Sequence, residues 1–532
     1  MRKLFAVLVI GAGLAAGTLA ADKTELAGML ARGYDALEYW DLPKADEVTV
    51  KLQAELPKEA DPAARVKIEV YFAEYWFNKG DYAQSLAALD RVVLLGAKRE
   101  GDYLEFDKRV RRLSEIFSAA KEAQSEHFRM RWIDPRDEVM VKPGLAALEK
   151  AWQALSKDLN HSPAGEKVLV ELYPKLSDLA AAVGLDEKML KDSGTIAICK
   201  FRRMMLASPR VLLFGYDYQT TMSHELAHFF VYTKSGPDVP VWFQEGLAKF
   251  EDQSYKAAAG QLDPVAKSFL TSAVKNNELI TFAQMHPTFA QFKTPKQGQL
   301  AFAEVETMVD YLRKSCGGDA WFRLLDLMEA GKDDKAAVEE VCGREFGSVW
   351  AGWKLDVLAR NWQVIPNAVV MKLEFKEQTG GEDEYEEVPV DKGKAYEYLR
   401  LGDLLRDRGF YGPACFEYQK AAALEPYVPM VLNKLGLGRV LAGNFKAALE
   451  PLNKVTQTYP GYSTGFVNLG LAYEGLKDDA QAIAAFERAS ELNPFNPAPY
   501  VKLFAIHERR GDQQKLDQVK EAFNIINRRP GG

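Results

Sequence analysis

The sequence reads His224-Glu225-Leu226-Ala227-His228 and, after sixteen further residues, Glu245. On a helix, residues four apart lie on the same face, so His224 and His228 can present two imidazoles to one metal ion. Glu225, next to the first histidine, would point toward a water on that ion instead of binding it. Glu245, on a second helix, is the third candidate ligand, and three protein ligands leave one tetrahedral position open, as in catalytic zinc sites. The sequence therefore predicts a Zn²⁺ centre with His224, His228 and Glu245 as ligands and Glu225 as general base.

The surrounding residues predict the local structure that such a site needs. Arg210–Phe214 reads as a short buried strand, and Thr220 or Thr221 can cap the helix that follows. Ser235–Asp238 breaks the chain, and Pro240 suits the start of the helix that carries the glutamate. Two alternatives stay open: an exposed helix whose histidines are merely solvated, and a zinc site without activity.

The motif and the segment Val239–Ala248 together resemble the gluzincin clan of metallopeptidases, and most closely its peptidase MA-like group. The resemblance is strongest over 205–255 and extends more weakly over 125–360. It implies an α+β, thermolysin-like zinc hydrolase acting on peptide bonds, with the three candidate ligands on the metal and Glu225 as base. No Gly-x-Met-x-Asn-like segment precedes the metal helix, so the resemblance does not extend to the aminopeptidases of the clan.

One part of a gluzincin site has no obvious counterpart. Members usually carry a Tyr or His that stabilises the oxyanion of the tetrahedral intermediate, whereas this chain has Phe302 where relatives often have tyrosine. Tyr311, Tyr255 and His286 are the remaining candidates, and we take Tyr311 as the candidate catalytic residue although it lies in an apolar helical stripe. Asp252 suits a carboxylate that orients a ligand imidazole. The missing donor keeps open an alternative function, an inactive interaction protein with a vestigial zinc site.

The amino terminus is typical of a signal peptide. Arg2-Lys3 precedes an apolar run that ends at Leu19, and Thr18-Leu19-Ala20 provides a small-residue cleavage site. The run is short for a spanning helix, and no later stretch is apolar enough to cross a membrane. We therefore expect an exported protein, periplasmic or secreted, without a membrane span after cleavage.

Composition and cysteines narrow the possible classes. With 68 basic and 75 acidic residues the formal net charge is −7, which gives no electrostatic reason to bind nucleic acid. Cys316 and Cys342 each precede a glycine at the end of an apparent helix and could pair in an oxidising compartment, or remain buried thiols. Cys199 and Cys415 fall in different predicted domains, so we do not expect them to pair.

The carboxyl-terminal part repeats every 34 residues. The recurring positions are Gly402, Gly436 and Gly470; Pro426, Pro460 and Pro494; and Ala414, Ala448 and Ala482. This spacing is that of tetratricopeptide repeats: three over 395–494, closed by helical residues up to about 527. Such arrays resemble scaffolds that bind a protein or peptide partner, and an array that only buttresses the enzyme domain is equally compatible.

Residues before the motif predict further elements. A helical hairpin with its turn at Asn78–Tyr82 resembles one tetratricopeptide unit. Strands are expected at Glu126–Trp132, Lys167–Leu172 and Thr195–Cys199, and Val211–Phe214 would be an edge strand able to pair with a substrate backbone. The predicted fold class is α+β: a gluzincin domain with a small mixed sheet, flanked by all-α tetratricopeptide-type repeats. Its parts are a signal peptide (1–20), a helical domain (21–122), the metallopeptidase domain (123–362), a linker (363–392) and the repeat domain (393–532).

Overall fold

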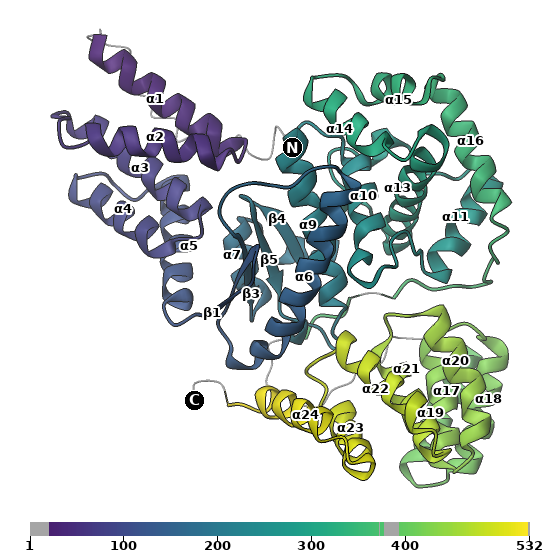
Figure 1. Cartoon of the computed structure of the whole chain (residues 1–532). Coiled ribbons are helices and arrows are strands. Elements are labelled where there is room, and N and C mark those ends of the chain that lie inside the picture. Colours follow the sequence, from purple (N-terminus) through teal and green to yellow (C-terminus); the bar gives the residue numbers. More distant parts are fainter. Residues whose placement is uncertain (1–20, 372, 377–392, 530–532) are drawn as a thin grey trace. The chain divides into compact units, whose positions relative to one another are not determined.

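A computed structural model describes residues 21–371, 373–376 and 393–529 (Figure 1). The predicted signal peptide and residues 377–392 of the predicted linker lie outside the described residues. The chain divides into two compact units, one of residues 1–133, 162–207 and 228–239, the other of residues 134–161, 208–227 and 240–532. No helix of the described part combines the length and the apolar character that crossing a membrane requires.

The first unit begins with five helices and continues into the sheet. The helices are α1 (Ala21–Glu38), α2 (Leu42–Glu55), α3 (Pro62–Asn78), α4 (Tyr82–Leu94) and α5 (Gly101–Phe117). Asp41, Asp61 and Asp81 each accept a backbone N–H in the first turn of α2, α3 and α4, which explains where these helices start. The hairpin of α3 and α4 turns where the sequence predicts, through Gly80 at φ +73°.

The sheet has five strands in the order β1-β2-β3-β5-β4. They are β1 (Lys121–Gln124), β2 (Phe128–Trp132), β3 (Val168–Tyr173), β4 (Ala197–Lys200) and β5 (Arg203–Ala207), accompanied by α7 (Leu176–Val183) and α8 (Glu187–Ser193). Strands β2, β3 and β5 run parallel, whereas β1 and β4 pair antiparallel at the two edges. The sheet is therefore mixed, as predicted, and it contains two strands, β1 and β5, that the sequence did not indicate.

The predicted edge strand at Val211–Phe214 is wrong. Pro209–Val211 forms a short 3₁₀ turn, and Leu212 makes only an isolated antiparallel bridge with Phe375. The Leu213 N–H donates to Glu374 O at 2.8 Å, and the Lys376 N–H donates to Val211 O at 2.8 Å. The chain's own segment thus takes the backbone groups that we expected a substrate to use.

A buried ion pair joins α4 to the sheet. Glu171 on β3 and Arg203 on β5 are 0% and 1% exposed, and Arg203 Nη1 donates to Glu171 Oε2 at 2.8 Å and to the Tyr82 hydroxyl at 2.7 Å. Arg131 on β2 also donates to Glu171. Burial acts to raise the pKa of the Glu171 carboxyl, but the charges of Arg203 and Arg131 lower it overall. Glu171, Arg203 and the Tyr82 hydroxyl thus form a buried polar cluster between α4 and the sheet.

Replacing Glu171 with Gln should lower the free energy of unfolding by about 3–5 kcal/mol, because the buried Arg203 and the half-buried Arg131 lose their counter-charge. Urea denaturation followed by circular dichroism would measure the change. Lys51→Gln is the matched control, since Lys51 pairs with Glu47 on the surface and should cost at most about 1 kcal/mol. Equal midpoints for the two variants would contradict the prediction.

The second unit contains helices on both sides of the metal motif. They are α6 (Glu138–Asp158), α10 (Val241–Glu251), α11 (Pro264–Asn276), α12 (Phe282–Met285), α13 (Pro295–Cys316), α14 (Ala320–Glu329), α15 (Asp334–Cys342) and α16 (Phe346–Ala359). Helix α9 (Tyr218–Ser235) belongs to both units, which divide between Ala227 and His228. Trp321 Nε1 donates to Val309 O at 2.8 Å, and Trp353 Nε1 to Thr307 Oγ1 at 3.1 Å, which places α13 at the centre of this helical group.

A disulfide joins Cys316 to Cys342 at the carboxyl ends of α13 and α15. This resolves the alternative that the sequence left open for the two residues. Neither Cys199 nor Cys415 takes part in a disulfide.

Eight helices form the repeat array in four antiparallel pairs (Figure 1). They are α17 (Lys394–Asp407), α18 (Tyr411–Leu424), α19 (Pro429–Leu441), α20 (Phe445–Thr458), α21 (Ser463–Gly475), α22 (Asp479–Leu492), α23 (Pro497–Arg510) and α24 (Gln513–Ile526). The recurring glycines mark close approaches: a Cβ on Gly402, Gly436 or Gly470 would come within 2.5 Å of Tyr418, Leu452 or Phe486, respectively. In the first three pairs the second helix thus packs a large side chain onto a first helix that has none at that point, which explains why glycine recurs every 34 residues.

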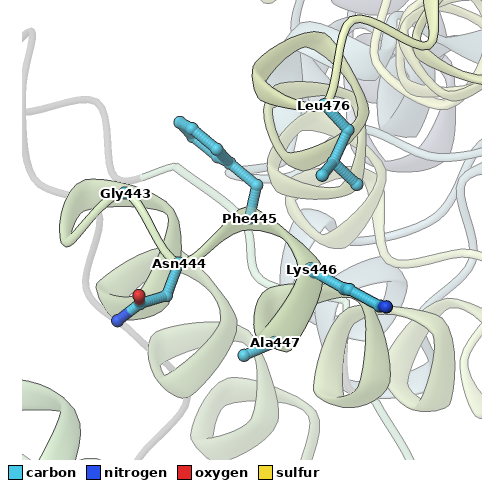
Figure 2. Close-up of a pocket in the computed structure, with 6 residues that line it drawn as sticks. All are labelled: Gly443, Asn444, Phe445, Lys446, Ala447 and Leu476. Carbon is cyan, nitrogen blue, oxygen red and sulfur yellow. The ribbon is translucent and has the colours of Figure 1, made fainter.

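The surface of the array carries a shallow hollow at the turn between α19 and α20 (Figure 2). It is lined by residues 443–447 and by Leu476 at the end of α21. None of the predicted metal ligands lines this hollow, so it is separate from the candidate site.

Candidate metal centre

Helix α9 starts where Asp217 can cap it. The Thr220 N–H donates to Asp217 Oδ1 at 3.1 Å, and the Thr221 hydroxyl donates to Asp217 O at 3.1 Å. The predicted cap, a threonine, is therefore wrong: α9 already begins at Tyr218, and the side chain of the preceding residue, Asp217, accepts an N–H of the first turn. Leu226 and Phe230, both fully buried, anchor the apolar face of the helix.

The three predicted ligands come together. One ligand atom from each of His224, His228 and Glu245 lies within 4.8 Å of the others, and all three residues are half-buried. His224 Nε2 is 3.5 Å from Glu245 Oε2. Two imidazoles and one carboxylate at this spacing fit Zn²⁺, whose catalytic sites commonly use this ligand set.

A glycine sets the position of the ligand helix α10. A Cβ on Gly246 would lie 2.7 Å from Val309 Cγ1 and 2.8 Å from Val305 O, both on α13. Only a residue without a side chain allows α10 to approach α13 this closely. The position of Glu245, the neighbour of Gly246, therefore depends on this close packing of α10 against α13.

The charges around the ligands favour a cation. Burial acts to lower the pKa of the His224 imidazole, but the hydrogen bond and charge of Glu245 raise that pKa overall, with Glu225 and Asp252 adding to the effect. Glu225 is buried, at 7% exposure. A bound metal ion would supply the positive charge that these carboxylates attract.

Phe302 lies beside the site, and Tyr311 does not. The rings of His224 and Phe302 have centroids 6.2 Å apart. Tyr311 follows Phe302 by nine residues on α13, which is two and a half helical turns and places it on the opposite face, about 13 Å further along the axis. The Tyr311 hydroxyl instead lies against Gly352 of α16, 2.1 Å from where a Cβ on that glycine would be. The structure therefore assigns Tyr311 to packing between α13 and α16.

Tyr255 is the candidate that lies beside the metal helix. Its hydroxyl is 3.2 Å from Thr220 Oγ1 and 3.4 Å from Asp217 Oδ1. Thr220 precedes His224 by four residues and hence lies on the same face of α9, one turn earlier. His286, by contrast, is exposed and follows the short helix α12.

A residue that the sequence did not single out lies near the proposed base. Tyr216 is buried, and burial raises the pKa of its hydroxyl, with further increases from the charges of Asp137 and Glu225. The Tyr216 side chain is thus within electrostatic reach of Glu225. Tyr216 lies eight residues before His224, a spacing that belongs to no motif, so the sequence alone does not indicate that it lies near the site.

Asp252 is buried on the carboxyl end of α10. Its Oδ2 atom is 2.5 Å from Lys249 Nζ, and its charge contributes to the raised pKa of His224. The orienting role that we predicted for Asp252 stays a prediction. The Ser223 hydroxyl on α9 donates to Glu251 O on α10 at 3.0 Å, so a hydrogen bond joins these two helices.

Comparison with known families supports the two parts of the chain. Residues 170–359 match the Peptidase MA superfamily, and residues 464–496 match the tetratricopeptide repeat. The chain thus carries a Peptidase MA superfamily domain followed by tetratricopeptide repeats, as the sequence predicted. Members of this superfamily are generally metal-dependent.

Similar solved structures are repeat proteins. MamA from Desulfovibrio magneticus RS-1 is 23% identical over 25% of this chain and 77% of its own, with a TM-score of 0.24. The first repeat domain of Spaghetti (RPAP3), bound to an HSP90 peptide, is 24% identical over 23% of this chain and 97% of its own, with a TM-score of 0.22. A thermophilic TPR protein of Thermus thermophilus is 22% identical over 25% of this chain and 74% of its own, with a TM-score of 0.23.

Proposed function

We propose that this chain is a zinc-dependent peptidase of thermolysin-like fold that hydrolyses peptide bonds, with repeats that bind a protein or peptide partner. The observation that carries the proposal is the meeting of His224, His228 and Glu245 within 4.8 Å. The buried Glu225 next to the first ligand supports it further. The ligand set leaves a coordination position for water or substrate, unlike the closed set of a structural zinc site.

The residues have distinct roles in the proposed reaction. His224, His228 and Glu245 would hold the ion, which, when bound, supplies Lewis-acid polarisation of the scissile carbonyl and of the attacking water. Glu225 accepts the proton of that water at its carboxylate and later donates it to the leaving amine. The Tyr255 hydroxyl is the best-placed of the candidate donors that the sequence suggested, because it lies along the ligand-bearing face of α9.

The setting proposed for this activity is outside the cytoplasm, periplasmic or secreted. The amino-terminal sequence motivates this proposal, and the Cys316–Cys342 disulfide supports it, since disulfides persist in oxidising compartments. Protein or peptide binding by the repeats is supported by their tetratricopeptide match. The net charge of −7 supports the expectation of no nucleic-acid partner.

A second candidate function is an inactive repeat scaffold that retains a zinc site. Phe302 beside His224 favours it, because a phenyl ring cannot donate a hydrogen bond to an oxyanion. Both candidates predict zinc binding, but only the peptidase predicts hydrolysis that depends on Glu225.

Purified full-length protein should contain about one zinc ion per chain, as a single site of three protein ligands requires. Inductively coupled plasma mass spectrometry after dialysis would measure the metal content. Removal of zinc by a chelator should abolish hydrolysis of a mixed peptide library, and zinc addition should restore it. A protein free of zinc that still cleaves peptides would contradict the proposed mechanism.

A further inference from the structure

The segment that leads into the metal helix packs against the repeat array at one of its turns. The Ser463 hydroxyl, at the start of α21, donates to Phe214 O at 3.1 Å. The rings of Phe214 and Tyr462 lie beside each other, with centroids 6.3 Å apart. The turn between the second and third repeats thus contacts the chain four residues before α9 begins.

The next inter-repeat turn contacts the same segment. A Cβ on Gly215 would lie 2.8 Å from Leu492 O and 2.9 Å from Asn493 Cβ, and Gly215 has φ +67°, so a side chain is excluded on both grounds. The Arg210 guanidinium lies 5.3 Å from the centroid of the Phe495 ring. Two successive turns of the array therefore hold residues 210–215 in place.

An ion pair extends this contact to the cap of the metal helix. Arg488 Nη2 on α22 donates to Asp217 Oδ2 at 2.9 Å. The other carboxylate oxygen of Asp217 accepts from the Thr220 N–H, and Lys256 Nζ lies 3.4 Å from Oδ2. The side chains of Arg488 and Asp217 are only 25% and 18% exposed, so solvent screens the pair less than it screens surface pairs.

The position of the pair connects it to the ligands. A carboxylate at a helix amino terminus is stabilised by the helix dipole and by the N–H it accepts, and it keeps the first turn from fraying. His224 follows Asp217 by seven residues, which is two turns of the same helix. The direction in which α9 presents its imidazoles therefore depends on the position and order of its first turn.

We infer that Arg488 is a positioning residue for the metal centre, acting through Asp217, and that the repeat array is part of the catalytic unit instead of an independent adaptor. This inference rests on the proposed function, because it assigns Arg488 a role toward that site. Burial acts to lower the pKa of Arg488, yet Asp217 and Glu491 raise it overall, consistent with a fixed ion pair.

The test uses full-length Arg488→Gln, with Arg488→Lys as the conservative variant and Arg509→Gln as the matched control. Arg509 on α23 pairs with Asp479 inside the array. The dissociation constant for Zn²⁺ alone would be measured by competition with a chromophoric chelator. Arg488→Gln should weaken zinc binding by about threefold to tenfold, at or below the range that lost ligand-supporting contacts cost. Arg488→Lys should return toward the parent value, and Arg509→Gln should match it.

Hydrogen exchange gives a second readout that needs no metal. Amides of residues 218–224 should exchange about tenfold faster in Arg488→Gln, because the first turn of α9 opens locally. Unchanged exchange together with unchanged zinc affinity would overturn the inference, as would equal losses in Arg488→Gln and Arg509→Gln. If Arg488→Gln does not fold, Asp217→Asn keeps a cap acceptor and removes only the charge, and zinc affinity equal to the parent's would overturn the inference. A parent protein that binds no zinc would contradict the proposed function instead. The exchange experiment would still show whether Arg488 stabilises the first turn of α9.

Discussion

Glu225→Gln is expected to lower kcat for peptide hydrolysis by about 10²–10⁴-fold while zinc stays bound at parental stoichiometry. Glutamine has nearly the same shape as glutamate but cannot accept the proton of the attacking water. The ligands His224, His228 and Glu245 are unchanged, so the metal content should not fall. Cleavage of a peptide library followed by mass spectrometry measures the rate, and plasma mass spectrometry measures the metal.

Glu329→Gln provides the control for this substitution, since Glu329 is exposed at the end of α14. It should retain the parental rate. A Glu225→Gln variant that cleaves as fast as the parent would contradict the role of Glu225 as base, whereas a zinc-bound parent without any hydrolytic activity would favour the inactive scaffold. If Glu225→Gln is inactive as expected, the same variant could trap uncleaved substrates among exported proteins.

His228→Ala is expected to weaken zinc binding by more than the about 10–100-fold that loss of an outer-shell contact costs, and to abolish hydrolysis with it. The reason is that His224 and Glu245 alone cannot enclose the ion. Chelator competition measures the affinity, and far-ultraviolet circular dichroism checks that the helices remain folded.

The matched control for His228→Ala is His161→Ala, which removes a histidine outside the ligand set. It should bind zinc as the parent does. If His228→Ala retained zinc at parental affinity, the ion would be held elsewhere, and the assignment of the ligands would be wrong.

The parts of the fold that the sequence predicted are those governed by local spacing. Two histidines four residues apart need only a helix to share a face, and glycines 34 residues apart need only neighbouring helices to pack. The mixed sheet was also predictable in part, because Phe128–Trp132 alternates between core and half-exposed positions. Each of these features can be recognised within a window of a few dozen residues.

The parts that the sequence did not predict depend on contacts between distant residues. Strand β5 (Arg203–Ala207) is buried throughout, so it shows no alternation, and its arginine is tolerated only because Glu171, 32 residues earlier, neutralises it. The apolar run at Val211–Phe214 looked like a strand, but Pro209 starts a 3₁₀ turn instead. The contact of Tyr311 with Gly352 of α16 is likewise one between distant residues, which the spacing along α13 does not indicate.

The absence of a side chain at Gly246 has a consequence for how the site tolerates change. Because α10 lies against the backbone and a valine side chain of α13 there, no room remains between the two helices at this point. A bulkier residue at Val309 would press against α10 and displace Glu245 with it, although Val309 is not a ligand. The position of a metal ligand thus depends on the volume of a side chain in a neighbouring helix as well as on the three donors themselves.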